Sequence, residues 1–438
     1  MESERIVLPW GKEEISATLP EGWRVVDIMK PSPLPGVSDA AQETASNLQS
    51  PIGSPRLANI ARPGIKVAVV IDDDSRPTPV AQIIPAVLAE LRQAGVSLDQ
   101  VTVIPALGVH RPMSQDEVAR RVGPSSFASL RSESHDCDDP ARLAFLGTTQ
   151  RGTPVYVNRM VAQSDLIVSI GCIEPHIIAS FGGGYKNLIP GIAGRKTIAH
   201  NHALNCQPAT FNNVGLPIER NPMRLDLEEG GRMLKSPVFI VNAVLNSSLQ
   251  VVKIVSGHPI EAHRAGVRVS AGIYGVSIPA VADLVIASSH PMDQDLRQGV
   301  KALANNIRSL RPGGTMITLV RAAEGVGVFG LANRKLPVGR RALKALSPVL
   351  LPLVPKLKIK GMGEEDRFFL YFVLQAMRRG NLLMYAPTIP AEIQERLPFA
   401  TFVQGIEDAL ARARLSLPRQ ARVVVVPHGG STYPILPA

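Results

Sequence analysis

Short apolar runs rich in β-branched residues alternate with amphipathic stretches along the chain. Residues 65–72 (IKVAVVID) form the first run, and apolar residues then recur every three or four positions until Gly95. Residues 100–108 (QVTVIPALG) form the next run. A strand, a helix and a second strand in this order predict a βαβ unit and a parallel sheet.

The same alternation continues to the end of the chain. A helix is predicted over residues 294–310, and further strands are predicted over residues 165–171, 238–246, 251–257, 282–289, 314–320, 381–387 and 422–430. We therefore expect an α/β fold with two domains, each a mostly parallel sheet flanked by helices.

The boundary between the domains is expected near residues 258–280, which gives domains of residues 1–270 and 271–438. Residues 31–62, rich in Pro, Ser and Ala, predict a linker with one short helix. The active site is expected in the cleft between the domains, because ligands of open parallel sheets bind beyond the carboxyl ends of the strands.

Length and cysteine content agree with this picture. The 438 residues exceed the ~250 at which single cores usually stop growing. Three cysteines, Cys137, Cys172 and Cys206, without a CxxC spacing, argue against a disulfide framework and a thiolate zinc site. A reducing compartment fits best, and the charged amino terminus lacks the apolar core of a secretion signal. We expect a cytoplasmic protein.

Neither membranes nor nucleic acids are expected partners. The most apolar stretch, residues 346–361, is interrupted by three prolines and three lysines, so it predicts a lid or an interdomain segment instead of a membrane span. The formal charge of +10 comes from scattered Lys and Arg without interleaved aromatic residues. Such a field also attracts small anions.

Polar clusters follow four of the predicted strands. They read DDDSRPTP (72–79), GVHRPM (108–113), GCIEPH (171–176) and SSHPMDQD (288–295). Because carboxyl ends of parallel strands share one edge of a sheet, all four can converge on one cleft.

The first three clusters contain candidate catalytic groups. DDDSRPTP either begins a helix or presents the planar fork of Arg76 to a carboxylate or phosphate, with Asp73 on a ribose hydroxyl or orienting Arg76. His110 and His176 could each be a structural residue with its hydrogen bonds satisfied, and not an acid or base. Two imidazoles at neighbouring strand ends nevertheless favour a pair that accepts and returns protons.

Two further segments carry amines and imidazoles. Lys186 lies in SFGGGYKNLIPG, a segment that lacks the Walker spacing and is consistent with a mobile turn. Lys186 itself is either a charge that binds phosphate or a nucleophile. His200 and His202 can each offer one metal ligand, without the pattern of a zinc site. Gln298 and Lys301 share the polar face of the predicted 294–310 helix, as a solvated face or as substrate contacts.

Taken together, these motifs resemble the lactate racemase family, the 2-hydroxyacid racemases and epimerases that use a nickel-pincer nucleotide. The resemblance runs through most of the chain. It rests on DDDSRP, GVHRPM, EPH with Lys186 ten residues on, His202 sixteen further on, and QGVK at 298–301.

The resemblance implies a cofactor and a site. Lys186 would be joined covalently to nickel pyridinium-3,5-bisthiocarboxylic acid mononucleotide, with Asp73 and Arg76 as further cofactor contacts. His202 would complete a planar nickel site, which suits this metal. His110 and His176 would be the acid/base pair, and the α-hydrogen would leave as hydride. Substrate contacts would come from Arg76, Arg297, Gln298 and Lys301.

Two departures from the family pattern bear on the substrate. Tyr185 and Arg297 are unexpected at their positions and are expected to border the substrate, so a sugar acid or a dicarboxylate is as plausible as lactate. Expected partners are a small 2-hydroxyacid and cofactor-biosynthesis proteins. The alternatives are a zinc-dependent hydrolase that uses His110, His176 and His202, and a non-catalytic relative that binds anions or nucleotides.

Overall fold

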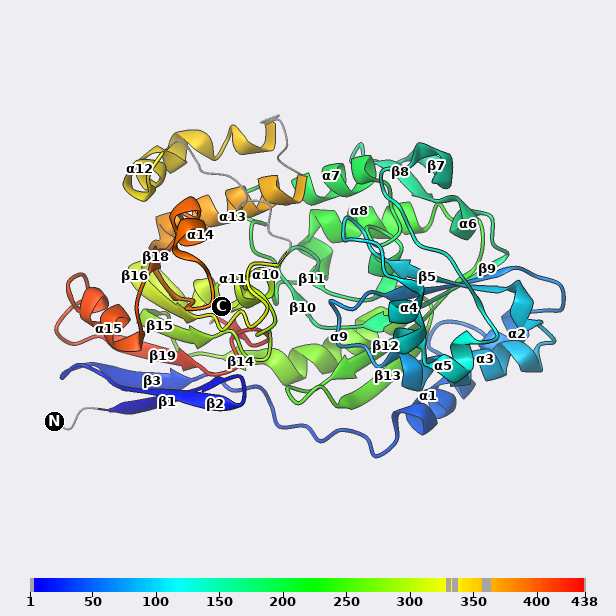
Figure 1. The fold of residues 1–438 in the computed structure, drawn as a ribbon, viewed down its shortest axis with the longest axis horizontal. Helices are drawn as coiled ribbons and strands as arrows, with labels where there is room; N and C mark the ends of the chain where they lie inside the picture. The colour runs from blue at the N-terminus through cyan, green and yellow to red at the C-terminus, as the bar shows by residue number, and fades with distance from the viewer. Residues whose placement is uncertain (1–3, 328–331, 333–337, 357–363, 437–438) are drawn as a thin grey trace.

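The computed structural model describes residues 4–327, 332, 338–356 and 364–436, and two six-stranded sheets dominate it (Figure 1). Within the first sheet only β12 and β13 pair antiparallel. The strands, in spatial order, are β13 Val251–Gly257, β12 Val238–Leu245, β9 Leu166–Cys172, β4 Val67–Asp72, β5 Val101–Ala106 and β6 Arg131–Ser132.

The second sheet is parallel throughout. Its strands, in spatial order, are β18 Thr401–Phe402, β17 Gly380–Tyr385, β16 Leu310–Leu319, β15 Ala282–Ser288, β19 Arg422–Val426 and β3 Arg24–Ile28. These two sheets confirm the α/β class with mostly parallel strands.

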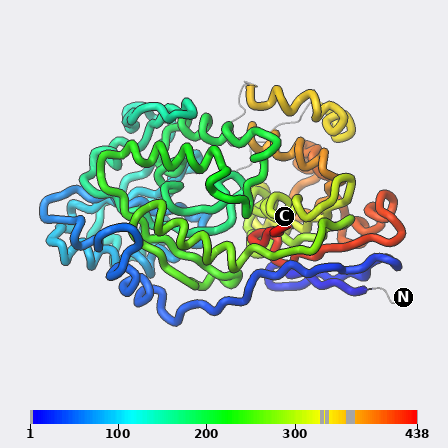
Figure 2. Tube along the Cα trace, turned by 180° about the vertical axis from the view of Figure 1, so that it is seen from behind, coloured from blue at the N-terminus to red at the C-terminus, as the bar shows by residue number. Residues whose placement is uncertain are grey.

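The amino-terminal residues lie with the second sheet. Strand β3 pairs with β19, and the hairpin β1 Arg5–Trp10 and β2 Glu13–Thr18 shares an apolar cluster with the same sheet. The chain then crosses to the first sheet, as the blue trace along the lower edge of Figures 1 and 2 shows. The division into residues 1–270 and 271–438 stays a prediction.

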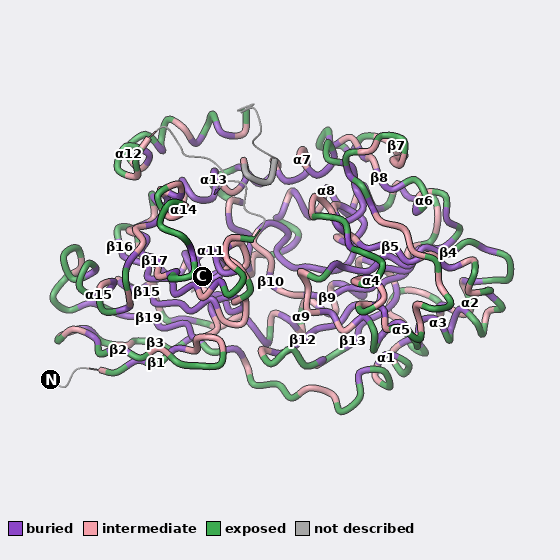
Figure 3. The backbone as a smooth tube through the Cα atoms, in the orientation of Figure 1, coloured by how far each residue is buried: buried purple, intermediate pink, exposed green. Residues whose placement is uncertain are grey.

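Strand β4 shows why its sequence is apolar without alternation. Val67, Val69 and Ile71 pack in the cluster that contains helix α3 Val80–Gln93, whereas Ala68 and Val70 pack in the cluster on the opposite face. Successive side chains point to opposite faces, and both faces of this sheet are covered. Buried residues accordingly concentrate in the strands of both sheets (Figure 3).

Several segments differ from expectation, and three of them show why. The predicted linker contains two helices, α1 Ala40–Gln49 and α2 Leu57–Ile60, which contact α3 because Leu48 and Leu57 are fully buried in its cluster. The predicted 294–310 helix divides into α10 Leu296–Gly299 and α11 Lys301–Asn306, and its last residue already begins β16. The third is an unpredicted hairpin, β7 Leu143–Thr148 and β8 Pro154–Asn158.

The remaining elements surround the sheets. They are α4 Gln115–Val122, α5 Pro124–Phe127, α6 Arg159–Ala162, β10 Pro175–His176, β11 Ser180–Phe181, α7 Arg195–Ala203, α8 Pro222–Gly231, α9 Glu261–Tyr274, β14 Gly275–Ser277, α12 Arg340–Leu350, α13 Glu364–Arg379, α14 Ala391–Arg396, α15 Ile406–Arg414 and β20 Tyr433–Ile435. In the described ranges, no helix combines the length and apolarity needed to cross a bilayer. Of the apolar stretch 346–361, residues 357–361 lie outside the described residues.

Candidate active site

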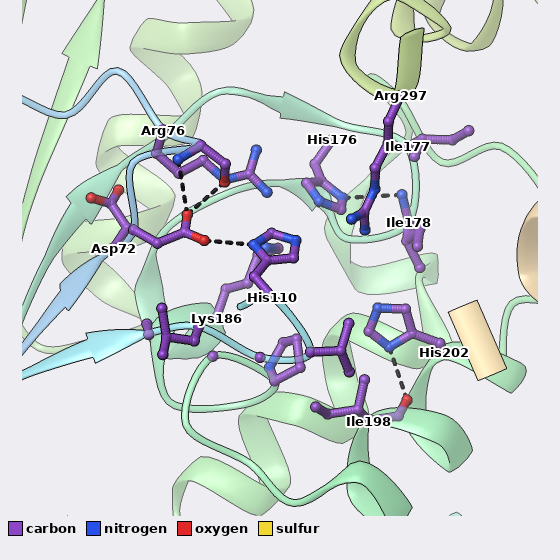
Figure 4. Close-up of a pocket in the computed structure, with 18 of the residues that line it drawn as sticks. Asp72, Arg76, His110, His176, Ile177, Ile178, Lys186, Ile198, His202 and Arg297 are labelled. Atoms are coloured by element: carbon purple, nitrogen blue, oxygen red, sulfur yellow. Dashed lines mark hydrogen bonds and ion pairs between the residues drawn. The ribbon is translucent and has the colours of Figure 1, made fainter. Parts of the chain in front are cut away.

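One cavity lies where the strand ends of the first sheet meet α10, α11 and α13 of the second half. Figure 4 shows the rings of His110, His176 and His202 around this space. Nine of the residues that the sequence predicted for the site line the cavity: Asp73, Arg76, His110, His176, Lys186, His202, Arg297, Gln298 and Lys301. The roles of these residues stay predictions, but their convergence is a feature of the fold.

His110 is oriented by Asp73, which directly follows β4. The Nδ1 atom of His110 lies 2.5 Å from Asp73 Oδ2, while Asp73 Oδ1 accepts a hydrogen bond from Ser75 Oγ. Burial alone would raise the pKa of Asp73, but the contact with His110, the hydrogen bond from Ser75 and the charge of Arg76 together outweigh it, and the pKa falls well below the usual range. A carboxylate on Nδ1 places the ring proton there, so Nε2 carries a lone pair and can act as a base.

His176 has the opposite arrangement. Its Nδ1 atom accepts the backbone N–H groups of Ile178 and Ala179, each at 3.2 Å. The neutral ring therefore carries its proton on Nε2. Burial and then the charge of Lys186 lower the pKa of His176 well below its usual value, which keeps the ring neutral.

Three asparagines hold the turn that contains His176. Asn205 and Asn221 each donate to the carbonyl oxygen of Ile178 at 2.7 Å, and Asn213 donates to the same oxygen at 3.3 Å. All three are buried. Such a network fixes the backbone N–H groups that point at His176.

The glycine-rich turn before Lys186 is held by packing. Gly183 and Gly184 have φ angles of 74° and 63°, which side chains with a Cβ rarely adopt. The buried Arg224 donates to Gly183 O at 3.1 Å, and a Cβ on Gly184 would lie 2.7 Å from its guanidinium. Asn242 Oδ1 accepts the N–H of Gly184 at 2.8 Å. These contacts argue against the reading of this turn as mobile.

This turn presents the Lys186 amine to the cavity. Burial, and next the charge of Arg76, lower the pKa of Lys186 to about 7. A substantial fraction of the amine is then neutral near pH 7, and the neutral amine is the nucleophilic form. Tyr185 is buried against Gly231 and is not among the lining residues, so the expectation that it borders the substrate is wrong.

The structure distinguishes the two histidines of α7. His202 lines the cavity, and its Nδ1 donates to Ile198 O at 2.9 Å, which leaves the Nε2 lone pair as the donor for a metal. His200 lies against Thr153 Oγ1 at 2.8 Å and does not line the cavity. The geometry therefore favours His202 as the ligand.

Glu174 is a site residue for which the sequence predicted no role, although it lies within the GCIEPH cluster. Its carboxylate accepts a hydrogen bond from Arg76 and lies 3.7 Å from Lys301 Nζ. Burial opposes its ionisation, but Lys301 and Arg76 hold the pKa of Glu174 below the usual range. Glu174 itself does not line the cavity, but its carboxylate joins two cations that do, Arg76 and Lys301 of α11.

The α10 helix brings Arg297 and Gln298 to the same cavity. Asp295 caps the helix by accepting the N–H of Gln298 at 2.7 Å. Among the described residues Gln298 Oε1 has no hydrogen-bond partner, although it is buried. A buried amide oxygen without a partner is costly, so this atom is suited to a ligand.

The donor set fits the cofactor that the resemblance implies. A nucleophilic amine at Lys186 and one imidazole lone pair at His202 fit a group that brings its other metal donors itself. In the described ranges, the only three neighbouring side chains close enough to share a metal ion are Asp136, Cys137 and Asp138. His110, His176 and His202 do not form such a group, which argues against the zinc hydrolase.

This chain is similar to known lactate racemases. Residues 10–212 match the lactate racemase N-terminal domain. Lactate racemases of Thermoanaerobacterium thermosaccharolyticum and Lactiplantibacillus plantarum are each 29% identical to this chain, over 74% of it and 76% of their own lengths.

Solved structures extend the match to the whole chain. The lactate racemase apoprotein from T. thermosaccharolyticum superposes with a TM-score of 0.82 at 25% identity and covers 99% of this chain and 100% of its own. A protein from Thermotoga maritima, at 16% identity and a TM-score of 0.64 over 91% of this chain and 97% of its own, shares the fold alone. The domain match, the named relatives and the full-length superposition show that this chain is similar to lactate racemases along its whole length, and they support an isomerase.

Proposed function

We propose that this racemase inverts the C2 centre of a 2-hydroxyacid with a nickel-pincer nucleotide attached to Lys186. One observation carries the proposal: a carboxylate-oriented imidazole, His110, and a buried amine of lowered pKa, Lys186, line one cavity with His176 and His202. That set provides a base, a tether, a hydrogen-bond donor and a metal ligand. The lactate racemases similar to this chain supply the reaction class.

Lys186 and His202 would hold the cofactor, with Asp73 and Arg76 as further contacts. When bound, the cofactor supplies a hydride acceptor, so the weakly acidic α-hydrogen does not have to leave as a proton. Cofactor-biosynthesis proteins are then required partners. The neutral fraction of Lys186 makes attachment feasible near pH 7.

The two histidines divide the work at the substrate oxygen. His110 Nε2 accepts the hydroxyl proton, because Asp73 holds the Nδ1 proton. His176 Nε2–H donates a hydrogen bond to the same oxygen. A scheme in which both rings exchange acid and base roles would need a proton on His176 Nδ1, where two backbone N–H groups already point.

The substrate is a small acid with a second polar end. Gln298 and Lys301 bind the carboxylate. The amide N–H groups of Gln298 donate to it directly, and the buried amide oxygen of Gln298 is satisfied by a bridging water. Arg297 lines the same space and recognises a second carboxylate or several hydroxyls. A sugar acid or a dicarboxylate therefore fits better than lactate.

The test is to produce the chain together with the cofactor-biosynthesis proteins. We expect bound nickel, added mass on the peptide that contains Lys186, and loss of optical purity in at least one member of a panel of 2-hydroxyacids. Lys186→Ala removes the added mass, whereas Lys196→Ala, an exposed lysine on α7, keeps it. Stoichiometric zinc without a nucleotide, or a loaded protein that racemises no acid in the panel, would contradict the proposal.

A further inference from the structure

A second cavity, of about 430 Å³, lies apart from the active site and shares no lining residue with it. Its walls come from the segment 208–217 between α7 and α8, from the residues just before β16, and from the last residue of α13. Three of the lining residues are arginines, Arg220, Arg308 and Arg379. We call this space the arginine cavity.

The three guanidinium groups come from separate parts of the chain. Arg220 ends a short turn of the first half, whereas Arg308 and Arg379 lie at the amino-terminal ends of β16 and β17 in the second half. These three arginines do not belong to a common sequence motif. The fold alone brings them together.

Backbone carbonyls are the partners of the two inner arginines. Arg379 Nε donates to Leu310 O at 2.7 Å, and Arg308 Nη1 lies 3.5 Å from Val214 O. No acidic residue lines the arginine cavity, and none of the described carboxylates forms an ion pair with these three arginines. Carbonyls satisfy N–H groups but leave the positive charge without a counter-charge.

This arrangement is unfavourable without a ligand. Burial, and next the charge of Arg379, lower the pKa of Arg308. An arginine nevertheless stays charged in proteins, so the like charges remain close together. A polar atom adds to the cost, because Thr210 Oγ1 on the wall is buried and has no hydrogen-bond partner among the described residues.

We propose that the arginine cavity binds a small oxyanion that carries two or more negative charges. Planar guanidinium forks from three directions match the oxygen atoms of such an anion, and the Thr210 hydroxyl can donate to it. The chemistry fits both inorganic phosphate and an organic polycarboxylate. The +10 formal charge of the chain attracts either one.

The bound anion bridges the two halves of the molecule, because Arg220 belongs to one half and Arg308 and Arg379 to the other. It also stabilises the segment that carries Asn213, which donates to Ile178 O behind His176. Asn212 in the same segment donates to Ala304 O at 2.6 Å, and Ala304 lines the active site. Occupancy of the arginine cavity therefore stabilises both walls of the active site.

The experiment uses the purified full chain without cofactor, titrated calorimetrically with inorganic phosphate and, separately, with citrate at constant ionic strength. Acetate, which carries one charge, is the reference anion. We expect saturable binding of phosphate or citrate, a higher melting temperature in its presence, and neither effect with acetate. Tighter binding of phosphate identifies the ligand as inorganic phosphate, and tighter binding of citrate identifies it as an organic polycarboxylate.

Three variants locate the site. Arg308→Gln and Arg220→Gln each raise the dissociation constant by about tenfold or more, because each removes a charge-assisted hydrogen bond. Arg220 is exposed, so its replacement leaves the fold intact. Arg378→Gln, a change at the exposed neighbour of Arg379, leaves binding unchanged. Absence of binding in the unmodified chain, or binding in Arg220→Gln and Arg308→Gln as tight as in the unmodified chain, would overturn the proposal.

Discussion

His110 and His176 line one cavity, yet their ring nitrogens are held in opposite ways. A carboxylate binds Nδ1 of His110, whereas two backbone N–H groups bind Nδ1 of His176. The first ring therefore offers a lone pair to the cavity and the second offers a proton. The same residue type at two neighbouring strand ends thus has two different chemical capacities.

The difference comes from the elements that hold each ring. His110 follows β5 and meets the side chain of Asp73 at the end of the adjacent β4. His176 begins a tight turn whose own backbone folds over its ring, and buried asparagines fix that turn. The proton positions are consequences of the fold and cannot be exchanged by a rotation of either ring.

Replacement of His110 tests the base and should have the largest effect. We expect His110→Ala to lower kcat by about 10⁴-fold, the upper range for loss of general acid–base catalysis, with the mass on Lys186 unchanged. His258→Ala, at a partly exposed histidine outside the cavity, is the control. Turnover similar to the control would remove His110 from the mechanism.

The carboxylate that orients His110 is tested by Asp73→Asn. An amide N–H at this position would place the ring proton on Nε2, where the lone pair is needed. We therefore expect kcat to fall by about 10³-fold, within the range for general acid–base catalysis, with little change in KM. Asp74→Asn, at the more exposed adjacent carboxylate, should leave kcat unchanged. An unchanged kcat in Asp73→Asn would mean that its contact with His110 is only structural.

His176→Asn tests the other side of the comparison. The asparagine oxygen can accept the same backbone N–H groups, and its amide can donate toward the cavity. We expect a loss of about tenfold, with the pH dependence of kcat as in the unmodified enzyme, because burial keeps His176 neutral. A loss as large as that of His110→Ala, or a changed pH profile, would support the symmetrical acid/base pair instead.

The sequence predicted which residues meet but not how they are held. Strand ends place His110 and His176 at one edge, and that rule needs only periodicity. The contact of Asp73 with His110 joins residues 37 positions apart, and the ion pairs of Glu174 join three separate segments. Neither leaves a local pattern that can be read from the chain.

The missed elements have a similar physical cause. Strand β2 has only Ala17 buried among its six residues, so its alternation is too weak to predict a strand. The arginine cavity draws Arg220, Arg308 and Arg379 from different elements, and scattered basic residues read only as overall charge. The pKa of Lys186 likewise depends on its burial and on charges from distant segments, such as Arg76 and Arg224.

The amine of Lys186 gives the smallest predicted effect. It is measured as a rate of acetylation and does not require catalytic turnover. With a pKa of about 7, the free amine of Lys186 increases as pH rises through that value. Acetylation of the cofactor-free chain by acetic anhydride should therefore become about threefold faster between about pH 6.5 and 7.5. Peptide mass spectrometry measures the rate, with the Lys196 peptide as the internal reference for reagent. If the acetylation rate of Lys186 had the same pH dependence as that of Lys196, burial would not lower the pKa of Lys186. Asp73 and Glu174 would then be sufficient to keep the amine charged beside His110.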